Sequence, residues 1–220
     1  MDALGRLSVF ASLGAAQLAT LNEAGDLARL GPGEPILSQG ETPAELIFLV
    51  TGAAAATQHD GPRGEAVTDV LLPPIAIACP AALLGLPSPV GVRTIVSSRL
   101  VIVPAAAVRS LIEQDATVGQ RFLAYALGEL HRMQAETCKL KLRSSVQRLA
   151  QYLLALAGEA EEVPARFVLP FEKRFLAGKI GCSRENLSRA FAALRRLGVE
   201  TQRGVVVIRD VAALRAFAGP

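Results

Sequence analysis

The chain has 220 residues, of which 51% are hydrophobic and 20% are charged, and its mean hydropathy is +0.36. This composition supplies enough apolar side chains for a buried core, and it excludes a wholly disordered protein. The length allows one large domain or two small ones, and no internal repeat indicates a solenoid. Three distant cysteines, Cys79, Cys138 and Cys182, give neither a disulfide framework nor a Cys-x-x-Cys metal pair.

No part of the sequence has the pattern of a signal peptide or a membrane span. The first residues include an acid and lack the long apolar run of a secretory signal. The uncharged stretch at residues 70–92 contains five prolines, which disrupt the backbone hydrogen bonds that a spanning helix must make. We therefore expect buried loop and strand in this stretch, and predict a cytoplasmic protein with no membrane partner.

Charge is distributed unevenly along the chain. Residues 1–142 hold 10 basic and 13 acidic residues, a net charge of −3, whereas residues 143–220 hold 13 basic and 7 acidic residues, a net charge of +6. A small basic domain beside a mildly acidic one indicates a polyanionic partner for the C-terminal part. The alternative is an ordinary solvated basic face.

The first hundred residues change from a helical to a strand-like pattern. Phe10 and leucines at helical spacing predict short helices within residues 3–29, before the breaker Gly31-Pro32-Gly33. Short apolar runs between Gly and Pro turns then indicate a sandwich or barrel. We expect strands at residues 36–38, 46–50, 53–57 and 66–72, a hairpin turn at 59–62, and a strand pair covering 93–103.

Helical patterns follow after Pro104. Residues 105–114 predict a short helix and residues 115–143 a long one. Along the long helix, apolar and small side chains repeat at alternating spacings of three and four, as in the seam of a coiled coil. The seam residues are Leu123, Ala126, Leu130, Met133, Thr137 and Leu140. This seam predicts a parallel homodimer, and the alternative is a helix packed on its own domain.

The C-terminal part has the pattern of two helices joined by a glycine-containing turn. We expect helices at residues 145–158, 172–180 and 183–197, strands at 167–170 and 205–208, and turns at 181–182 and 203–204. In the helix at 183–197, at 100° per residue, leucines and Phe191 fall on one face and would be buried. The residues of the opposite face are Arg184, Glu185, Ser188 and Arg189, and Ser183 can cap the helix.

These exposed groups suit the edges of DNA bases. Arginine offers a fork to guanine O6 and N7, and glutamate accepts a hydrogen bond from the cytosine amino group. They lie in the first two turns, the part of a recognition helix that enters the major groove. The candidates for phosphate contacts are Lys173, Arg174, Lys179, Ser183, Arg195 and Arg203. The alternative for all these groups is a solvated, charged helix surface.

The run from Gly181 to Arg189, Gly-Cys-Ser-Arg-Glu-Asn-Leu-Ser-Arg, closely resembles the recognition-helix motif of the CRP/FNR family of bacterial transcription regulators. Residues 33–52 resemble the sensor β-roll of that family, the long helix its dimerisation helix, and residues 148–154 the start of its DNA-binding domain. The resemblance implies an α+β fold. Its parts would be a cyclic-nucleotide-binding-like β-roll (jelly roll) at 1–114, a dimerisation helix at 115–142 and a winged helix-turn-helix at 143–220.

The resemblance also implies partners and a target. The partners would be a second copy of the chain, palindromic double-stranded DNA and RNA polymerase. Arg184, Glu185 and Arg189 match the base-contacting residues of the catabolite-regulator type, whereas Glu185, Ser188 and Arg189 match those of the FNR type. The implied half-site is therefore close to TTGA or TGTGA. Residues 169–173 and 187–191 are similar to the nitric-oxide-responsive branch of the family.

The expected signal is not cyclic AMP. Family members that bind cyclic nucleotides use a Gly-Glu pair and a downstream Arg-Ser/Thr pair, which hold the ribose and the phosphate. Residues 77–82 lack the acid, and no charge occurs between Asp69 and Arg93. We interpret Arg93 and Thr94 as an edge-strand pair rather than a phosphate site, and expect an uncharged pocket that suits an apolar ligand or none.

Haem is one candidate cofactor, because Cys79-Pro80 resembles a haem-ligating dipeptide and the chain has two histidines, His59 and His131. The alternatives are a buried Cys79, a solvated or interhelical His131 on the long helix, and a His59 that lies in a turn. The candidates for effector binding are thus Cys79, Arg93, Thr94 and His131. An FNR-type iron–sulfur cluster needs four cysteines and is not expected. Oxidation of Cys182, beside the recognition helix, is hypothesised to disturb DNA binding.

A second function from another class stays open at this point. The chain could be a haem or small-molecule sensor whose C-terminal helices contact protein rather than DNA. An enzyme is not expected, because the sequence has no nucleophile–His–acid set, no metal-ligand spacing and no phosphate loop.

Overall fold

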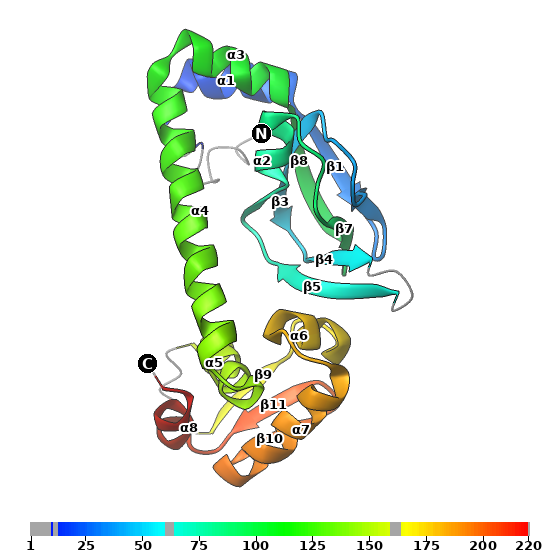
Figure 1. Ribbon diagram of the computed structural model, residues 1–220, viewed down its shortest axis with the longest axis vertical. Coiled ribbons are helices and arrows are strands. Elements are labelled where there is room, and N and C mark those ends of the chain that lie inside the picture. Colours follow the sequence, from blue (N-terminus) through cyan, green and yellow to red (C-terminus); the bar gives the residue numbers. More distant parts are fainter. Residues whose placement is uncertain (1–9, 11–12, 60–63, 159–163, 220) are drawn as a thin grey trace. The chain divides into compact units, whose positions relative to one another are not determined.

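The computed structural model describes residue 10 and residues 13–59, 64–158 and 164–219. The chain divides into two compact units, residues 1–132 (unit 1) and 133–220 (unit 2) (Figure 1). A long helix, α4 (Ala116–Leu142), crosses the boundary, so each unit contains part of it. Its ends lie within one residue of the bounds expected for the dimerisation helix.

Unit 1 contains two four-stranded antiparallel sheets, which form the expected β-roll (Figure 1). The first sheet has the strand order β1-β8-β3-β6, and the second has the order β2-β7-β4-β5. The strands are β1 (Asp26–Leu30), β2 (Pro35–Leu37), β3 (Glu45–Thr51), β4 (Ala54–His59), β5 (Glu65–Leu71), β6 (Ile75–Ile77), β7 (Gly91–Thr94) and β8 (Ser98–Pro104).

Both sheets contribute to one buried cluster. Leu49 and Leu100 of the first sheet pack with Leu37 and Val92 of the second, and each of the four is at most 4% exposed. Fully burying such a side chain contributes about 1.5–3 kcal/mol. Burial alternates along β7, where Val92 is buried and Arg93 is partly exposed. Strand alternation therefore directs Arg93 to the outer face of its sheet.

Three short helices cover the first sheet together with the start of α4: α1 (Ala15–Ala24), α2 (Cys79–Leu84) and α3 (Ala105–Gln114) (Figure 1). Phe10 packs edge-on against Phe48 of β3 and Phe122 of α4, with ring centroids 5.0 and 5.7 Å apart. Phe122 and Val118 are the buried residues of α4. The predicted helices at 105–114 and 115–143 are confirmed.

Several predictions for unit 1 are wrong in detail. Residues 26–29, which are predicted to be helical, instead belong to the edge strand β1 (Asp26–Leu30), because Gly25 takes an extended conformation and the strand pairs with β8. The stretch at 70–92 contains the helix α2, which is too short to show a helical period, and Pro80 is tolerated in its first turn.

The strands expected to pair within residues 93–103 lie in different sheets. β7 pairs with β2 and β4, whereas β8 pairs with β1 and β3. The pattern of apolar residues predicts a strand, but it carries no information about which strand lies beside it. The hairpin turn expected at 59–62 lies mostly outside the described residues, and the flanking strands β4 and β5 do pair.

Gly52, at the turn between β3 and β4, offers a test of the β-roll. It has a φ of +97°, and an added Cβ would lie 2.7 Å from the Ser97 carbonyl oxygen and 2.8 Å from the Ser98 Cα. Backbone strain and the clash together are expected to make Gly52→Ala less stable by about 2–5 kcal/mol in urea unfolding. Gly40→Ala is the control, since Gly40 has a φ of +82° and open space around it. Equal losses in both variants would contradict the clash.

Unit 2 is a winged helix-turn-helix domain. Its elements after α4 are α5 (Ser145–Ala157), β9 (Ala165–Val168), α6 (Lys173–Ile180), α7 (Arg184–Leu194), a 3-10 turn (Arg195–Leu197), β10 (Val199–Gln202), β11 (Val205–Ile208) and α8 (Val211–Ala218). The sheet has the order β10-β11-β9. Helix α5 contacts α6, α7 and α8, and its Leu149 and Leu153 are fully buried.

The main differences from the predictions for unit 2 are at its strands. The strand expected at 167–170 lies at 165–168, and β10 and α8 were not predicted separately. The turn at Arg203-Gly204 is confirmed: both residues have positive φ, 49° and 83°, and they join β10 to β11 as the wing. The helix expected to reach residue 197 ends at Leu194 and continues as the 3-10 turn.

Candidate nucleic-acid interface and sensor pocket

The turn between α6 and α7 is held by its backbone. Gly181 has a φ of +70°, a conformation that glycine adopts without a steric penalty. The Cys182 backbone N–H then donates to the Ala177 carbonyl oxygen at 3.0 Å. The Ser183 hydroxyl accepts a hydrogen bond from the Asn186 backbone N–H at 3.2 Å, so the predicted cap is confirmed. These contacts fix where the first turn of α7 begins.

Helix α7 buries one face and exposes the other. The buried side chains are Leu187, Ala190, Phe191 and Leu194. The exposed side chains in the first two turns are Arg184, Glu185, Asn186, Ser188 and Arg189. The four residues predicted to read bases therefore lie together on the solvent side, as the helical wheel required.

Two of these side chains are already oriented by neighbours. An Nη2 hydrogen of Arg189 is donated to Asn186 Oδ1 at 2.7 Å, and the Ser188 hydroxyl donates to the Arg184 carbonyl oxygen at 3.1 Å. A backbone hydrogen bond, the Ser183 hydroxyl and the nearby Arg184 and Arg189 lower the pKa of Glu185. Its carboxylate is thus an acceptor at neutral pH. Sequence reasoning missed Asn186, whose place three residues before Arg189 was its one signal.

The candidates for phosphate contacts differ in their surroundings. Arg195 and Arg203 are exposed, and Lys179 is half-buried. The Lys173 ammonium lies 5.0 Å from the centre of the Phe191 ring, which links α6 to α7. Arg174 pairs with Glu172 at 3.1 Å, so a phosphate would have to compete with that carboxylate.

The predicted seam of α4 is exposed in the single chain. Leu123, Leu130, Met133 and Leu140 have exposed fractions of 51–61%, and Ala126 and Thr137 are also exposed. Cys138 is exposed on the same helix. Large apolar side chains at heptad positions on a helix rarely face water in the working form of a protein.

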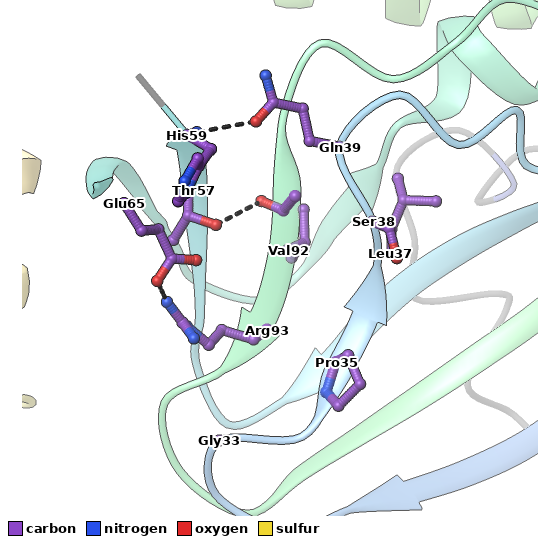
Figure 2. A pocket seen from close by; sticks show the side chains of 11 residues that line it. Gly33, Pro35, Leu37, Ser38, Gln39, Thr57, His59, Glu65, Val92 and Arg93 are labelled. Carbon is purple, nitrogen blue, oxygen red and sulfur yellow. Dashed lines mark hydrogen bonds and ion pairs between the residues drawn. The ribbon is translucent and has the colours of Figure 1, made fainter. Parts of the chain in front are cut away.

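A pocket of about 340 Å³ lies on the second sheet of the β-roll (Figure 2). Its lining includes polar side chains from β4, β5, β7 and the loop after β2: Ser38, Gln39, Thr57, His59, Glu65 and Arg93. Arg93 of β7 forms an ion pair with Glu65 of β5, across the intervening strand β4. The expectation of an uncharged pocket is wrong for this cavity, because the charges come from strands on both sides of the uncharged stretch.

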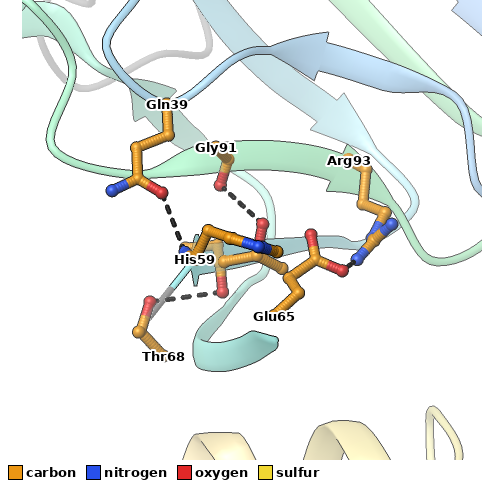
Figure 3. Close-up of polar contacts among 8 residues, drawn as sticks. Gln39, His59, Glu65, Thr68, Gly91 and Arg93 are labelled. Atoms are coloured by element: carbon orange, nitrogen blue, oxygen red, sulfur yellow. Dashed lines mark hydrogen bonds and ion pairs between the residues drawn. The ribbon is translucent and has the colours of Figure 1, made fainter. Parts of the chain in front are cut away.

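Hydrogen bonds inside this pocket join its strands (Figure 3). Gln39 Oε1 accepts from the His59 backbone N–H at 2.8 Å, and the Thr57 hydroxyl donates to the Gly91 carbonyl oxygen at 3.4 Å. Several polar groups that line the pocket, those of Gln39, Thr57, Glu65 and Arg93, thus already bond to other parts of the protein.

The other effector candidates lie elsewhere. Thr94 is buried, and its hydroxyl accepts from the Glu34 backbone N–H at 2.9 Å and donates to Gly31. It is not at an edge, since β7 lies between β2 and β4. Cys79 is 8% exposed in the core cluster of Phe10 and Phe48, and burial raises the pKa of its thiol to about 11. His131 is exposed on α4. Arg93 is therefore the one of the four that lines the pocket.

Ala78, the residue just before α2, has a strained backbone conformation that a substitution can test. It has a φ of 51°, where an L-residue with a Cβ loses about 1–2 kcal/mol. Ala78→Gly is therefore expected to raise the free energy of unfolding by about 1 kcal/mol, measured by urea titration. Ala124→Gly, on the exposed surface of α4, should lower it by a similar amount. Destabilisation by both changes would contradict the strain at Ala78.

Comparison with protein families gives two matches, and no curated protein sequence matches the chain. Residues 27–115 match the family model of the cyclic nucleotide-binding domain. Residues 147–217 match the model of the Crp-like helix-turn-helix domain. The first match corresponds to the β-roll with α3, and the second to the domain that carries α7.

Solved structures agree over nearly the whole chain. A candidate cyclic-nucleotide-binding protein from Ruegeria pomeroyi is 27% identical, with coverage of 99% of this chain and 97% of that chain and a TM-score of 0.69. FixK2 from Bradyrhizobium japonicum is 19% identical, with coverage of 89% and 98% and a TM-score of 0.73. A CRP-family transcriptional regulator from Thermus thermophilus is 24% identical, with coverage of 88% and 97% and a TM-score of 0.69.

The order of the domains agrees with these matches. Both matched domains occur in the order of the family, with the long helix α4 between them and an exposed polar face on α7. Within the described residues, no helix is long and apolar enough to cross a membrane. The two matched domains together cover most of the chain, and the chain therefore belongs to the CRP/FNR family of DNA-binding transcription regulators.

Proposed function

We propose that the protein is a homodimeric, sequence-specific regulator that binds a palindrome with half-sites close to TTGA or TGTGA. The observation that carries the proposal is the outward face of α7. Arg184, Glu185 and Arg189 are exposed there together, while Leu187 and Phe191 fix the opposite face in the core. A surface that bound phosphate alone would gain nothing from an ionised Glu185, whereas cytosine presents an amino donor to it.

The proposal includes a second copy of the chain. The apolar seam of α4 is exposed over five turns, from Leu123 to Leu140, and an identical helix would cover it. Two copies would place two recognition helices on two half-sites, as the symmetry of a palindrome requires.

We propose a signal at the β-roll other than cyclic AMP. Cys79 lies in the region where the cyclic-nucleotide-binding members of the family carry an acid. The Thr94 hydroxyl is already hydrogen-bonded to the backbone of Glu34 and Gly31, and Arg93 is already paired with Glu65. We propose no haem at Cys79, because its side chain is 8% exposed and packs in the core cluster of Phe10 and Phe48. The finer parts of the proposal are a cytoplasmic location, contact with RNA polymerase and no enzymatic activity.

The test is a binding titration by fluorescence anisotropy at physiological salt. The probes are a TTGA palindrome, a TGTGA palindrome and a scrambled duplex of equal length. Specific regulators prefer their site by at least about 10³-fold, so we expect a preference of that order for one palindrome. Equal affinity for all three duplexes would overturn the proposal and favour a sensor whose C-terminal helices contact protein.

A further inference from the structure

Arg148, in the first turn of α5, lies between the C-terminal ends of two other helices of unit 2. Its Nη1 donates to the carbonyl oxygens of Arg143 at 2.5 Å and Leu140 at 3.4 Å, at the end of α4. Its Nε donates to the Ile180 carbonyl oxygen at 2.7 Å and its Nη2 to that of Gly181 at 3.1 Å, at the end of α6. One guanidinium thus caps α4 and α6 at the same time.

The chemistry of these two ends explains why an arginine is there. The last carbonyl groups of a helix have no partner within the helix, and the helix dipole makes this end negative. Guanidinium is planar and carries five N–H groups in a rigid fork, so its two sides can bind different helices. A lysine ammonium at the same place has a single nitrogen and cannot span both ends. Arg148 is half-buried, which limits competition from water.

A second contact joins the same two ends. A Cβ added at Gly181 would lie 2.7 Å from Cδ2 of Leu140, so the last seam leucine of α4 reaches the helix-turn-helix turn. Two residues later, Ser183 caps the N-terminus of the recognition helix α7. The linker between α4 and α5 is also short, because α4 ends at Leu142 and α5 begins at Ser145. Ser144 caps α5 through a reciprocal pair of hydrogen bonds with Gln147.

We propose that Arg148 is a positioning residue that sets the angle between the end of the dimer helix and the recognition helix. In a dimer, the seam would fix the positions of the two α4 ends relative to each other. Because Arg148 bonds the end of α4 to the end of α6, it would then fix where each α7 begins relative to its α4. The spacing between the two recognition helices, and so the half-site spacing that the dimer accepts, then depends on this guanidinium. The inference rests on the proposed function and adds to it the element that selects spacing.

The test compares Arg148→Lys, Arg148→Gln and the matched control Arg215→Lys, which changes an exposed arginine of α8. Each protein is titrated with palindromes whose spacer changes by one base pair at a time, and with a duplex that carries a single half-site. The wild type and Arg215→Lys should share one preferred spacing. In both Arg148 variants, the ratio of affinity for the preferred spacing to affinity for the other spacings should fall at least tenfold. The affinity for the single half-site should change less than threefold.

A merely structural role would lower the affinity for every duplex alike, and that result would overturn the proposal. So would an unchanged spacing preference in folded, dimeric Arg148 variants, checked by circular dichroism and light scattering. If the wild type itself binds no palindrome, the proposed function fails instead, and the two failures are distinguishable.

Hydrogen exchange on the wild-type protein gives a readout that does not depend on the variants. Segments 139–148 and 178–186 contain the two helix ends that Arg148 joins. Their amides should gain protection together when the palindrome is added. Protection of the second segment alone would contradict the link.

Discussion

Arg189→Ala should weaken binding to the preferred palindrome by about 2–6 kcal/mol per dimer, because one bidentate contact to guanine discriminates by about 1–3 kcal/mol in each half-site. Arg189 is exposed on α7, and Asn186 holds its guanidinium from the adjacent turn at 2.7 Å. Its loss is therefore expected to remove one proposed base contact without disturbing the buried face of the helix. Anisotropy titrations on the palindrome and on a duplex changed at the guanine pair measure the effect.

The control for this prediction is Lys173→Ala. Lys173 is exposed at the start of α6, and a lysine that contacts phosphate adds affinity for all sequences alike. Its loss should weaken both duplexes equally and reduce the slope of log K against log salt by about one per chain. If Arg189→Ala also weakens both duplexes equally, Arg189 contacts phosphate and does not read a base.

Leu130→Asp should convert the protein to a monomer at micromolar concentration. Leu130 is 51% exposed in the single chain and lies in the middle of the seam. In the dimer the change removes two buried leucines, worth about 3–6 kcal/mol, and places two carboxylates beside each other. Light scattering during size-exclusion chromatography measures the mass. Affinity for the palindrome should fall to that for a single half-site.

Ala135→Asp is the matched control, because Ala135 is exposed on the side of α4 opposite the seam. This variant should stay dimeric and bind the palindrome as the wild type does. A dimeric Leu130→Asp protein would show that another surface holds the two chains together.

Several parts of the molecule could be predicted because their signals are local. Helices α3, α4 and α5 follow from apolar residues at helical spacing, and Ser183 caps α7 as its place before Arg184 indicates. The two faces of α7 follow from helix geometry alone. The roles of these residues in DNA binding are predictions from their side-chain chemistry and from the resemblance to a family motif, since spacing by itself does not distinguish a recognition helix from another amphipathic helix.

Other parts depend on contacts between distant residues. Strands β7 and β8 look like one hairpin in the sequence, yet they belong to different sheets. Arg93 and Glu65 are 28 positions apart, and they form the charged side of a pocket only because β5 and β7 both flank β4. Leu27 continues the helical spacing of the leucines before it, but pairing with β8 stabilises a strand at residues 26–30.

The amino-acid sequence by itself determined the division into an acidic N-terminal part and a basic C-terminal part, the long helix with its seam, and the chemistry of the α7 surface. These features depend on composition and on periods of three to four residues. Only the tertiary structure decided the sheet partners, the position of the pocket, the burial of Cys79 and the bridge that Arg148 makes between two helix ends. The physical reason is that these features depend on contacts between backbone carbonyls and side chains that are far apart in the chain, and local periodicity does not specify such contacts.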